Sequence, residues 1–352
     1  MTILVTGSAG FIGANFVLDW FNQTDEKIVS LDLLTYAGNL ENLSLHEKNP
    51  LHSFIKGNIS NRELITSILN KFDIRAIINF AAESHVDRSI HDPKDFIDTN
   101  IVGTFNLLES TRLYWNNLEE ARRKTFRFLH ISTDEVYGSL EKSDPQFNES
   151  NSYKPNSPYS ASKAASDHLV RAWHHTYGLP VLTTNCSNNY GPYQFPEKLI
   201  PLCILNALNN KPLPVYGDGT QIRDWLYVKD HCSAIRLVLN KGNVGETYNV
   251  GGWNEKTNLE VIRALCGVLD DLKPKADNTK YSDLITFVKD RPGHDKRYAI
   301  DASKLKHELN WEPEESFETG IYKTVEWYIN HQNWVNNVIS GNYRSWVQKQ
   351  YS

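Results

Sequence analysis

The chain has 352 residues, which is enough for one large domain or two. Charged residues make up 22% and hydrophobic residues 40%, which are ordinary values for a folded globular protein. The formal net charge of −5 argues against general nucleic-acid binding, so an anionic ligand must be met by a local cluster of cations.

The four cysteines are far apart in the sequence and include no Cys-x-x-Cys pair: Cys186, Cys203, Cys232 and Cys266. This spacing predicts reduced thiols rather than disulfides or a zinc site. A first strand is expected from Thr2, which leaves no room for a signal peptide, and no apolar run approaches membrane-spanning length. We therefore expect a cytoplasmic protein with no metal, no membrane partner and no nucleic-acid partner.

The N-terminus predicts a strand, a glycine turn and a helix. Thr2–Thr6 is apolar, Gly7-Ser-Ala-Gly10-Phe-Ile-Gly13 follows at once, and apolar residues then recur at helical spacing. The glycines allow a tight turn, approach to a pyrophosphate, and close packing of the helix on its strand. A glycine triple alone is a weak signal, but here it stands between a strand and a helix.

An acidic residue, Asp32, ends the second predicted strand, Lys27–Asp32. A carboxylate at this place accepts hydrogen bonds from a ribose 2′-hydroxyl and repels a 2′-phosphate. Leu33 and Leu34 follow, with no Arg to receive that phosphate, so NAD is favoured over NADP. The alternative is that Asp32 only caps the following segment.

Further strands are predicted at 52–59, 76–81, 128–131 and 180–186, with a helix from Pro93 to about Tyr114. This alternation predicts an α/β fold, a doubly wound parallel sheet of the Rossmann type. Beyond residue 187 the segments become shorter and richer in Pro, Gly and aromatics, although a helix at 229–239 and a strand at 246–250 belong again to the sheet. We predict an NAD-binding domain of 1–187 and 229–251. A smaller, discontinuous substrate-binding domain covers 188–228 and 252–352, and its tail from Phe317 to Trp346 packs as helices.

Five polar residues gather where the two parts meet. Thr133, Asp134 and Glu135 follow the strand at 128–131, and ligands of parallel sheets bind at such strand ends. Tyr159 and Lys163 are four residues apart and share one helix face. The set suits acid–base chemistry beside a redox cofactor, while the alternative is a solvated turn and a surface Tyr–Lys pair.

The second part supplies cations that could meet a diphosphate: Lys198, Arg223, Arg291 and Arg297. The alternative is that these four side chains are solvated surface charges, as most Lys and Arg side chains are. His85, taken alone, is interpreted as a loop residue.

The glycine turn, Asp32, Ser132-Thr133 and Tyr159-x-x-x-Lys163 resemble the extended short-chain dehydrogenase/reductase superfamily, whose members modify nucleotide sugars. Within it, Thr133-Asp-Glu-Val-Tyr-Gly138, Ala82–Ser89, Ser187–Pro201 and Arg223–Val228 are similar to the dTDP-glucose 4,6-dehydratase family. The likeness runs from Thr2 past Arg297, and the Thr-Asp-Glu triplet is its most specific mark.

The resemblance implies roles for individual residues. It makes Thr133, Asp134, Glu135, Tyr159 and Lys163 catalytic. It places NAD on Gly7, Gly10, Phe11, Ile12, Gly13, Asp32, Asn58, Ile59, Phe80, Ala81, Ala82, Ser84, Thr99, Tyr159, Lys163 and Asn189. It places the dTDP-glucose substrate on Ser84, His85, Thr133, Asn188, Lys198, Leu199, Pro214, Tyr216, Arg223, Asn258, Arg291 and His294.

Asn58 departs from the family, which usually carries Asp toward the adenine. Asn keeps a carbonyl acceptor, so we expect NAD binding to survive. The resemblance further implies a homodimer through helices near residues 100–115 and 161–176, and a place in deoxysugar biosynthesis of the dTDP-rhamnose type.

The chemistry predicted for these residues is loss of water without net oxidation. Lys163 is expected to lower the pKa of Tyr159, which takes the proton of the sugar's 4-hydroxyl. Oxidation at carbon 4 acidifies the proton on carbon 5, Glu135 removes that proton as a base, and Asp134 protonates the departing 6-hydroxyl. Hydride then returns to carbon 6.

Three alternatives remain open from the sequence. A 4-epimerase needs Tyr159, Lys163 and NAD but has no use for Asp134 and Glu135. A dehydratase acting on a UDP- or CDP-sugar would share most of the residues, because nothing but the resemblance separates thymine from uracil or cytosine. A non-catalytic NAD-binding sensor would have no use for Tyr159 or Lys163.

Overall fold

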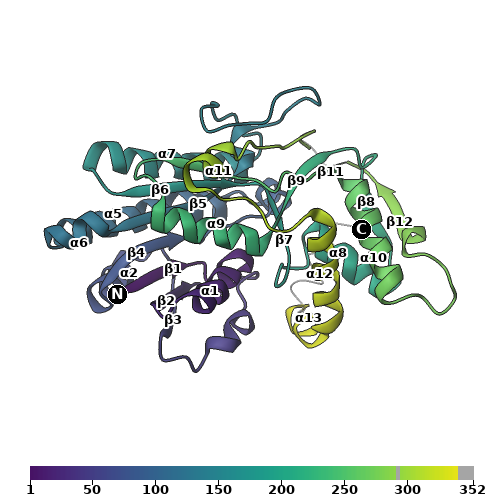
Figure 1. The fold of residues 1–352 in the computed structure, drawn as a ribbon, viewed down its shortest axis with the longest axis horizontal. Helices are drawn as coiled ribbons and strands as arrows, with labels where there is room; N and C mark the ends of the chain where they lie inside the picture. The colour runs from purple at the N-terminus through teal and green to yellow at the C-terminus, as the bar shows by residue number, and fades with distance from the viewer. Residues whose placement is uncertain (291–293, 340–352) are drawn as a thin grey trace.

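A computed structural model describes residues 1–290 and 294–339 (Figure 1). Its centre is a seven-stranded sheet in which every neighbouring pair is parallel. The strands, in spatial order, are β3 (His52–Lys56), β2 (Lys27–Asp32), β1 (Thr2–Thr6), β4 (Ile74–Asn79), β5 (Arg127–Thr133), β6 (Val181–Cys186) and β10 (Thr247–Val250). The order 3-2-1-4-5-6 is that of dinucleotide-binding sheets, so the predicted fold class is confirmed.

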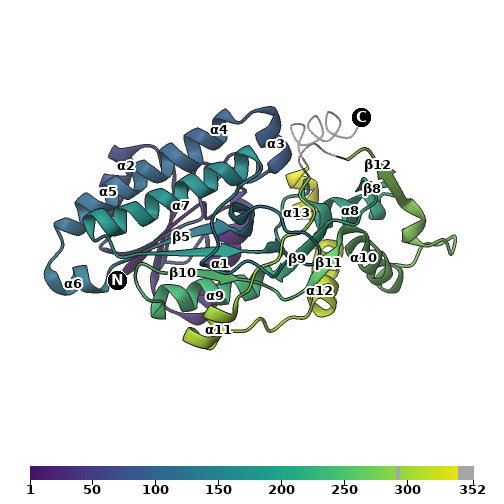
Figure 2. The same ribbon diagram turned by 90° about the horizontal axis from the view of Figure 1, so that it is seen from above.

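Helices cover both faces of the sheet (Figure 2). One layer holds α2 (Arg62–Lys71), α5 (Thr104–Asn116) and α7 (Pro158–Tyr177); the other holds α1 (Phe11–Gln23), α9 (Val228–Lys241) and α11 (Ser303–Leu309). The central strands are buried on both sides, which is why they appear in the sequence as nearly continuous apolar runs.

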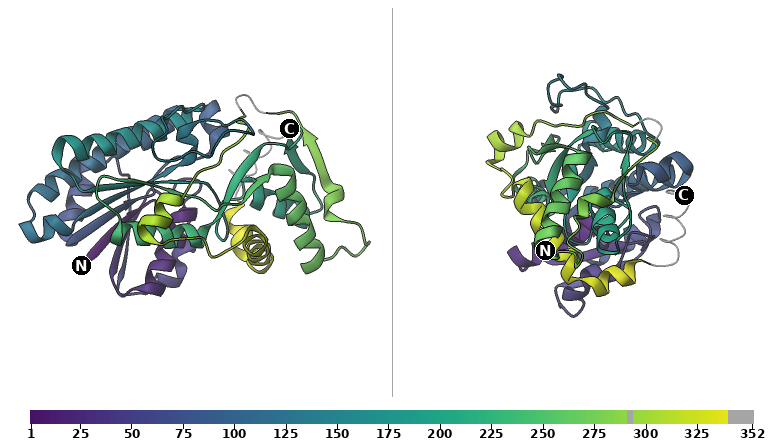
Figure 3. Two further views of the ribbon diagram at one scale, coloured as in Figure 1. Left: turned by 45° about the horizontal axis from the view of Figure 1, so that its top comes forward. Right: turned by 90° about the vertical axis from the view of Figure 1, so that its right-hand side faces the viewer.

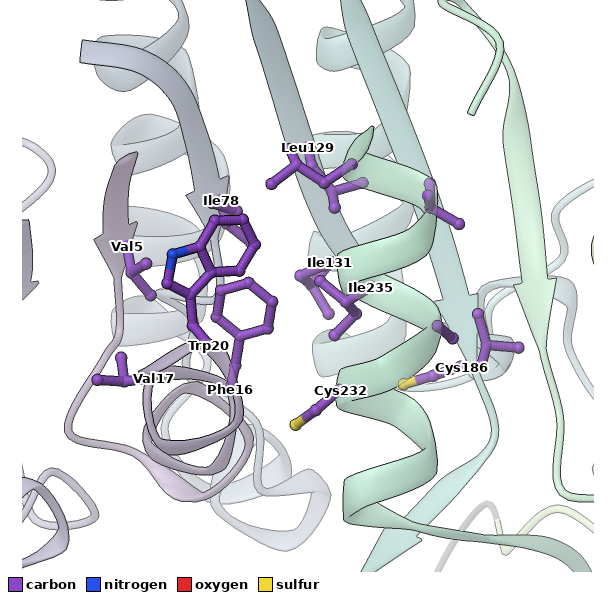
Figure 4. Close-up of a cluster of buried hydrophobic side chains, with 14 of the residues drawn as sticks. Val5, Phe16, Val17, Trp20, Ile78, Leu129, Ile131, Cys186, Cys232 and Ile235 are labelled. Atoms are coloured by element: carbon purple, nitrogen blue, oxygen red, sulfur yellow. The ribbon is translucent and has the colours of Figure 1, made fainter. Parts of the chain in front are cut away.

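The core between the sheet and the second layer is built on large side chains from α1. Phe16 and Trp20 pack beside Val5 and Ile78, and Ile235 of α9 faces them (Figure 4). All five side chains are essentially excluded from solvent. This packing fixes the start of α1 against β1, and therefore the glycine turn between them.

A smaller lobe lies beyond one end of the sheet (Figure 3, left). It contains a three-stranded sheet of β7 (Asn188–Tyr190), β9 (Ile222–Tyr227) and β11 (Glu255–Thr257), and a pair of β8 (Leu213–Tyr216) with β12 (Ile285–Val288). Its helices are α8 (Leu199–Leu208), α10 (Asn258–Leu272), α12 (Phe317–Asn330) and α13 (Gln332–Val338). Phe317, Val325, Tyr328 and Trp334 of the tail are buried in its core, while Tyr322 is exposed and Trp346 lies outside the described residues.

Short elements complete the connections: η1 (Leu40–His46), α3 (Val86–His91), α4 (Lys94–Phe96), η2 (Ile97–Gly103), α6 (Glu120–Thr125), η3 (Asp134–Tyr137) and η4 (Tyr281–Leu284). The helix predicted from Pro93 to about Tyr114 is present from Lys94 to Asn116, but its middle, η2, is a π-helical segment between α4 and α5, which was not predicted. Within η2 the Asn100 side chain donates to Ser162 Oγ of α7 and to the Glu83 carbonyl, which ties the widened turn to its neighbours.

The strand predicted at 52–59 also ends early, at Lys56. Gly57 donates to the Asp32 carbonyl, and Asn58 Oδ1 accepts from Ser60 N at 2.8 Å, so the chain turns there. Across the described residues, no helix has both the length and the apolar composition to cross a membrane. The four cysteines are free and buried.

Candidate active site

The glycine turn lies at the carboxyl end of β1 and lines one large cavity. Gly7 has a φ of +66°, and a Cβ there would meet Ala81 N at 2.6 Å. A Cβ on Gly13 would meet Gly7 O at 2.2 Å, so α1 can pack on the turn only without a side chain. Gly10 is less crowded, its nearest neighbour being Gly7 O at 3.3 Å, and it begins α1 on the cavity wall. The turn therefore presents a helix N-terminus to the cavity.

Asp32 lies beside that turn at the end of β2. Its Oδ2 accepts from Ala9 N at 2.8 Å and its Oδ1 from Leu34 N at 2.8 Å. Burial raises the pKa of Asp32, and these backbone hydrogen bonds oppose the rise. Each carboxylate oxygen keeps a further lone pair for a ligand hydroxyl, as a dinucleotide's ribose requires. The residues present thus fit a dinucleotide cofactor.

The remaining residues predicted to contact the cofactor line the same cavity: Phe11, Ile12, Asn58, Ile59, Phe80, Ala81, Ala82, Ser84, Thr99, Tyr159, Lys163 and Asn189. Asn58 is the departure from the family pattern. Its carbonyl oxygen accepts from Ser60 N and, having two lone pairs, can accept one more hydrogen bond from a ligand, while its amide NH₂ can donate.

The carboxyl end of β5 places Thr133, Asp134 and Glu135 on the cavity wall. The Thr133 hydroxyl accepts from Glu135 N, capping η3, and donates to Asp134 Oδ1 at 3.3 Å. Asp134 is 2% exposed, and its Oδ2 has no hydrogen-bond partner among the described residues. Burial raises the pKa of Asp134 well above its ordinary value, and the charge of Glu135 adds to the rise. A protonated carboxyl here is what a general acid requires.

Tyr159 and Lys163 project from the first turns of α7 into the cavity. The helix begins where the sequence dictates, because Ser157 and Ser160 form a reciprocal cap and Pro158 occupies the first position. Tyr159 is fixed further by its N–H, which donates to Ser89 Oγ at 3.2 Å.

The predicted lowering of the Tyr159 pKa by Lys163 was wrong for this structure. Burial raises the pKa of Tyr159 well above its ordinary value, and Glu135 adds to the rise. Lys163 Nζ donates instead to the Ile131 carbonyl at 2.7 Å. Burial lowers the pKa of Lys163, while the charge of Asp167 opposes that change. The four-residue spacing placed Tyr159 and Lys163 on one helix face, but it could not show that both side chains are buried away from water, which is what shifts their pKa values.

On the substrate side, Lys198 Nζ donates to the Ser84 carbonyl at 3.0 Å, and Asn188 lines the cavity beside them. His85 lies behind this wall, where its Nδ1 caps α3 by accepting from Arg88 N. Leu199 begins α8 directly after Lys198.

Three residues that support this wall were missed by the sequence analysis. Glu197 is buried and accepts from Tyr36 Oη at 2.9 Å and from Arg88 Nε at 3.1 Å. The Arg88 guanidinium also lies 3.6 Å from the centroid of the Tyr36 ring. The signal was present, since Arg88 and Glu197 both fall inside segments that carry the family resemblance.

Other predicted substrate residues form a second group in the lobe, away from the described cavity wall. Tyr216 and Pro214 are on β8, and the Tyr216 ring contacts the edge of His294, 6.1 Å between centroids. His294 pairs with Asp290, which accepts from the side chain of Gln221. Asn258 begins α10, and its N–H donates to the Gln221 carbonyl. Arg291 lies outside the described residues.

Arg223 connects the two groups. It is buried, donates to the Asp295 carbonyl at 3.0 Å, and stacks over Tyr298 at 4.4 Å. Its charge opposes the rise in the pKa of Asp134, so it lies near the acidic end of the cavity.

The prediction that Arg297 meets a diphosphate was wrong. Its guanidinium donates to both carboxylate oxygens of Glu255, at 2.6 and 2.9 Å, and to the Asp144 carbonyl. It is therefore a structural ion pair. Among the described residues there is no cluster of His, Cys, Asp or Glu able to hold a metal ion.

The fold and cavity define the class: a Rossmann-type dinucleotide-binding protein with acid–base residues at the carboxyl edge of its sheet. The chain belongs to the GDP-mannose 4,6 dehydratase family, which matches residues 4–324. It is 62% identical over 343 residues to the dTDP-glucose 4,6-dehydratase of Xanthomonas campestris pv. campestris, covering 97% of each chain.

Solved structures of dTDP-glucose 4,6-dehydratases are also similar to this chain. A dTDP-glucose 4,6-dehydratase from Bacillus anthracis in complex with NAD is 47% identical, with a TM-score of 0.85 over 96% of this chain and 99% of that one. A dTDP-glucose 4,6-dehydratase from Streptomyces venezuelae, with NAD and TYD bound, is 43% identical, with a TM-score of 0.85 over 95% and 98%. The resemblance stated from the sequence motifs is confirmed.

Proposed function

We propose that the chain is an NAD-dependent dTDP-glucose 4,6-dehydratase, which converts dTDP-D-glucose into dTDP-4-dehydro-6-deoxy-D-glucose and water. The observation that carries the proposal is the buried Asp134 beside Glu135 on the same cavity wall as Tyr159 and Lys163. Support for NAD comes from the glycine turn, from Asp32, and from the cofactor bound in the relatives.

NAD, held by the glycine turn and Asp32, would supply the hydride acceptor for carbon 4 of the sugar and the hydride donor for carbon 6. Tyr159 takes the proton of the 4-hydroxyl. Because burial raises its pKa, the proposal requires that the charge of Lys163, one turn along the same helix face, stabilises the phenolate during the reaction. Glu135 removes the proton from carbon 5, which the adjacent ketone has acidified. Asp134, whose pKa is raised by burial, delivers its proton to the 6-hydroxyl as that group leaves.

Two residues separate this function from its closest alternative. A 4-epimerase uses the tyrosine, the lysine and the cofactor. The buried Asp134 and its neighbour Glu135 would have no role in that reaction. The family is described by GDP-mannose, but the relative with 62% identity over 97% of both chains acts on a dTDP-sugar. Identity of that extent favours dTDP-glucose over UDP-, CDP- or GDP-sugars.

In the same proposal, each of the two predicted domains binds one ligand. Residues 1–187 and 229–251 hold the cofactor, while 188–228 and 252–352 hold the nucleotide side of the substrate through Lys198, Arg223, Asn258, Arg291 and His294. Within the second set, α11 packs back on the seven-stranded sheet. Four free, buried thiols support a reducing compartment, the cytoplasm, where deoxysugar nucleotides of the dTDP-rhamnose type would be made.

A homodimer is part of the proposal. The layer of η2, α5 and α7 lies on one face of the sheet (Figure 2). It carries exposed apolar side chains: Ile97 on η2, Phe105 and Leu113 on α5, and Tyr177 at the end of α7. Phe105→Glu should give a monomer in sedimentation, whereas Leu45→Glu, at an exposed site on η1, should leave the dimer intact. A wild-type protein that sediments as a monomer would contradict this part.

The function itself is tested by offering dTDP-glucose, UDP-glucose, CDP-glucose and GDP-mannose separately and recording product masses. Loss of one water from dTDP-glucose alone is the expected result. An unchanged mass with conversion to the galactose configuration would show that the protein is an epimerase. Water loss from another nucleotide sugar would show that the substrate carries a different nucleotide.

A further inference from the structure

The ammonium of Lys163 is enclosed by protein, and an aspartate on its own helix carries the opposite charge. Lys163 is 4% exposed and Asp167 is 5% exposed. Because they are four residues apart on α7, they share one helix face. Asp167 therefore extends the line of Tyr159 and Lys163 by one more turn, away from the cavity.

His130 of β5 lies between the two charged groups. Its Nε2 is 3.3 Å from Asp167 Oδ1 and 3.4 Å from Lys163 Nζ. The other carboxylate oxygen of Asp167 accepts from Ser132 Oγ at 2.7 Å. Strand β5 thus holds one oxygen of the aspartate by a hydrogen bond and places the His130 ring beside the other oxygen, which has no hydrogen-bond partner among the described residues.

A chain of hydrogen bonds fixes the tautomer of His130. The Thr6 hydroxyl accepts a hydrogen bond from Ala81 N and donates one to Asn79 Oδ1 at 2.7 Å. The Asn79 amide is then left to donate to His130 Nδ1 at 3.1 Å, which places the ring proton on Nε2, facing Asp167. Burial lowers the pKa of His130 to about 4, so the ring is neutral, and the charge that raises the pKa of Lys163 comes from Asp167.

The other titratable groups around Lys163 and Asp167 do not supply that charge. They come from four segments: Tyr153 from the loop before α7, Asp134, Glu135 and Tyr137 from η3, Cys186 from β6, and Tyr159 from α7. Burial raises the pKa of the three tyrosines and of Cys186, so these groups are uncharged at neutral pH, and it shifts Asp134 toward its uncharged form. The charge of Glu135 acts on Tyr159 and raises its pKa, against ionisation.

We propose that Asp167, held by His130 and Ser132, is a positioning residue that keeps the buried Lys163 protonated. The inference rests on the proposed function, which gives Lys163 and Tyr159 their roles. Its consequence is that an aspartate outside the cavity sets the pH range over which Lys163 keeps the charge that the proposed function requires of it.

The direct test is the titration of Lys163 by NMR in protein labelled at the lysine Cε, with and without NAD, the signal being identified by its loss in Lys163→Arg. Asp167→Asn keeps the shape and removes the charge, so the pKa of Lys163 should fall by about 1–2 units. Asp19→Asn is the matched control, because Asp19 pairs with Arg236 on the opposite face of the sheet. An unchanged Lys163 titration in Asp167→Asn would overturn the proposal.

The kinetic readout is the rate of cofactor reduction in a single turnover, followed by absorbance across pH. Its alkaline limit should move to lower pH by the same amount in Asp167→Asn and return toward wild type in Asp167→Glu. A rate lowered equally at every pH would show a merely structural role. If Asp167→Asn does not fold, Ser132→Ala should give a smaller shift in the same direction, and no shift would count against the proposal.

The two proposals fail differently. A wild-type protein that removes no water from dTDP-glucose would overturn the proposed function, while the lysine titration would still decide the role of Asp167. Normal water loss with an unmoved titration would overturn only the role of Asp167.

Discussion

The carboxylate of Asp32 accepts a hydrogen bond from the backbone N–H of Ala9, 2.8 Å away, and so joins the end of β2 to the glycine turn. This contact fixes the carboxylate where a ribose 2′-hydroxyl would bind and where a 2′-phosphate would be repelled. NAD should therefore bind much better than NADP.

Asp32→Ala should narrow the gap between the two cofactors, mainly by weakening NAD. The measurement is a pair of calorimetric titrations with NAD and NADP, and Asp25→Ala, at an exposed site before β2, is the control that should leave both affinities unchanged. Equal affinity of the wild-type protein for both cofactors would mean that Asp32 does not meet the ribose.

Asp134→Asn should separate oxidation from water loss. The amide keeps the shape and a hydrogen-bond donor but cannot deliver a proton to the departing hydroxyl, and removal of a general acid typically costs ~10²–10⁴ in rate. Reduced cofactor should accumulate when dTDP-glucose is added, while water loss falls steeply. Unimpaired water loss in a folded Asp134→Asn protein, checked by thermal melting, would exclude the acid role.

Glu135→Gln should block the exchange of the hydrogen on carbon 5 with deuterated water and leave hydride transfer from carbon 4 in place. The reason is that Gln cannot accept the proton that the ketone has acidified. Mass spectrometry of sugar recovered after incubation in deuterated water measures this. Normal incorporation of deuterium at carbon 5 would give the base role to another group.

Glu255→Gln should destabilise the protein at neutral pH by about 1–3 kcal/mol, because it breaks a charge-assisted pair with Arg297 that is largely buried. The Arg297 guanidinium lowers the pKa of Glu255, so this stabilisation is present above the unfolded value of about 4.3 and is lost as pH falls through the lowered folded value. Urea unfolding of the two proteins across pH should show curves that converge in acid. A gap of constant size down to the acid limit would show that charge is not its cause.

The predictable parts of the site are those whose position follows from residues close to them in the sequence. The glycine turn, Asp32 and the Thr133–Glu135 triplet each follow a strand directly, so strand ends placed them in one cavity. Tyr159 and Lys163 followed from helix periodicity. His130 and Asp167 could have been found in the same way, since one is a polar residue inside an apolar strand and the other lies four residues beyond Lys163.

The predictions that failed depended on distant partners or on burial. Arg297 was expected at a diphosphate, but its partner is Glu255, 42 residues away in sequence. The pKa of Tyr159 was expected to fall beside Lys163, and burial raises it instead. The helix predicted from Pro93 is continuous, but its π-helical segment η2, where Asn100 donates to Ser162 of α7, could not be predicted from local spacing.

The central claim, that water is lost through a transient oxidation at carbon 4, is tested most directly with dTDP-glucose deuterated at carbon 4. Tyr159 and Lys163 act on that carbon, whereas Asp134 and Glu135 act on carbons 6 and 5, so one enzyme should move the label between them. The account predicts a product that has lost one water and carries the deuterium at carbon 6. A product that keeps its deuterium at carbon 4, or that retains its water, would contradict it.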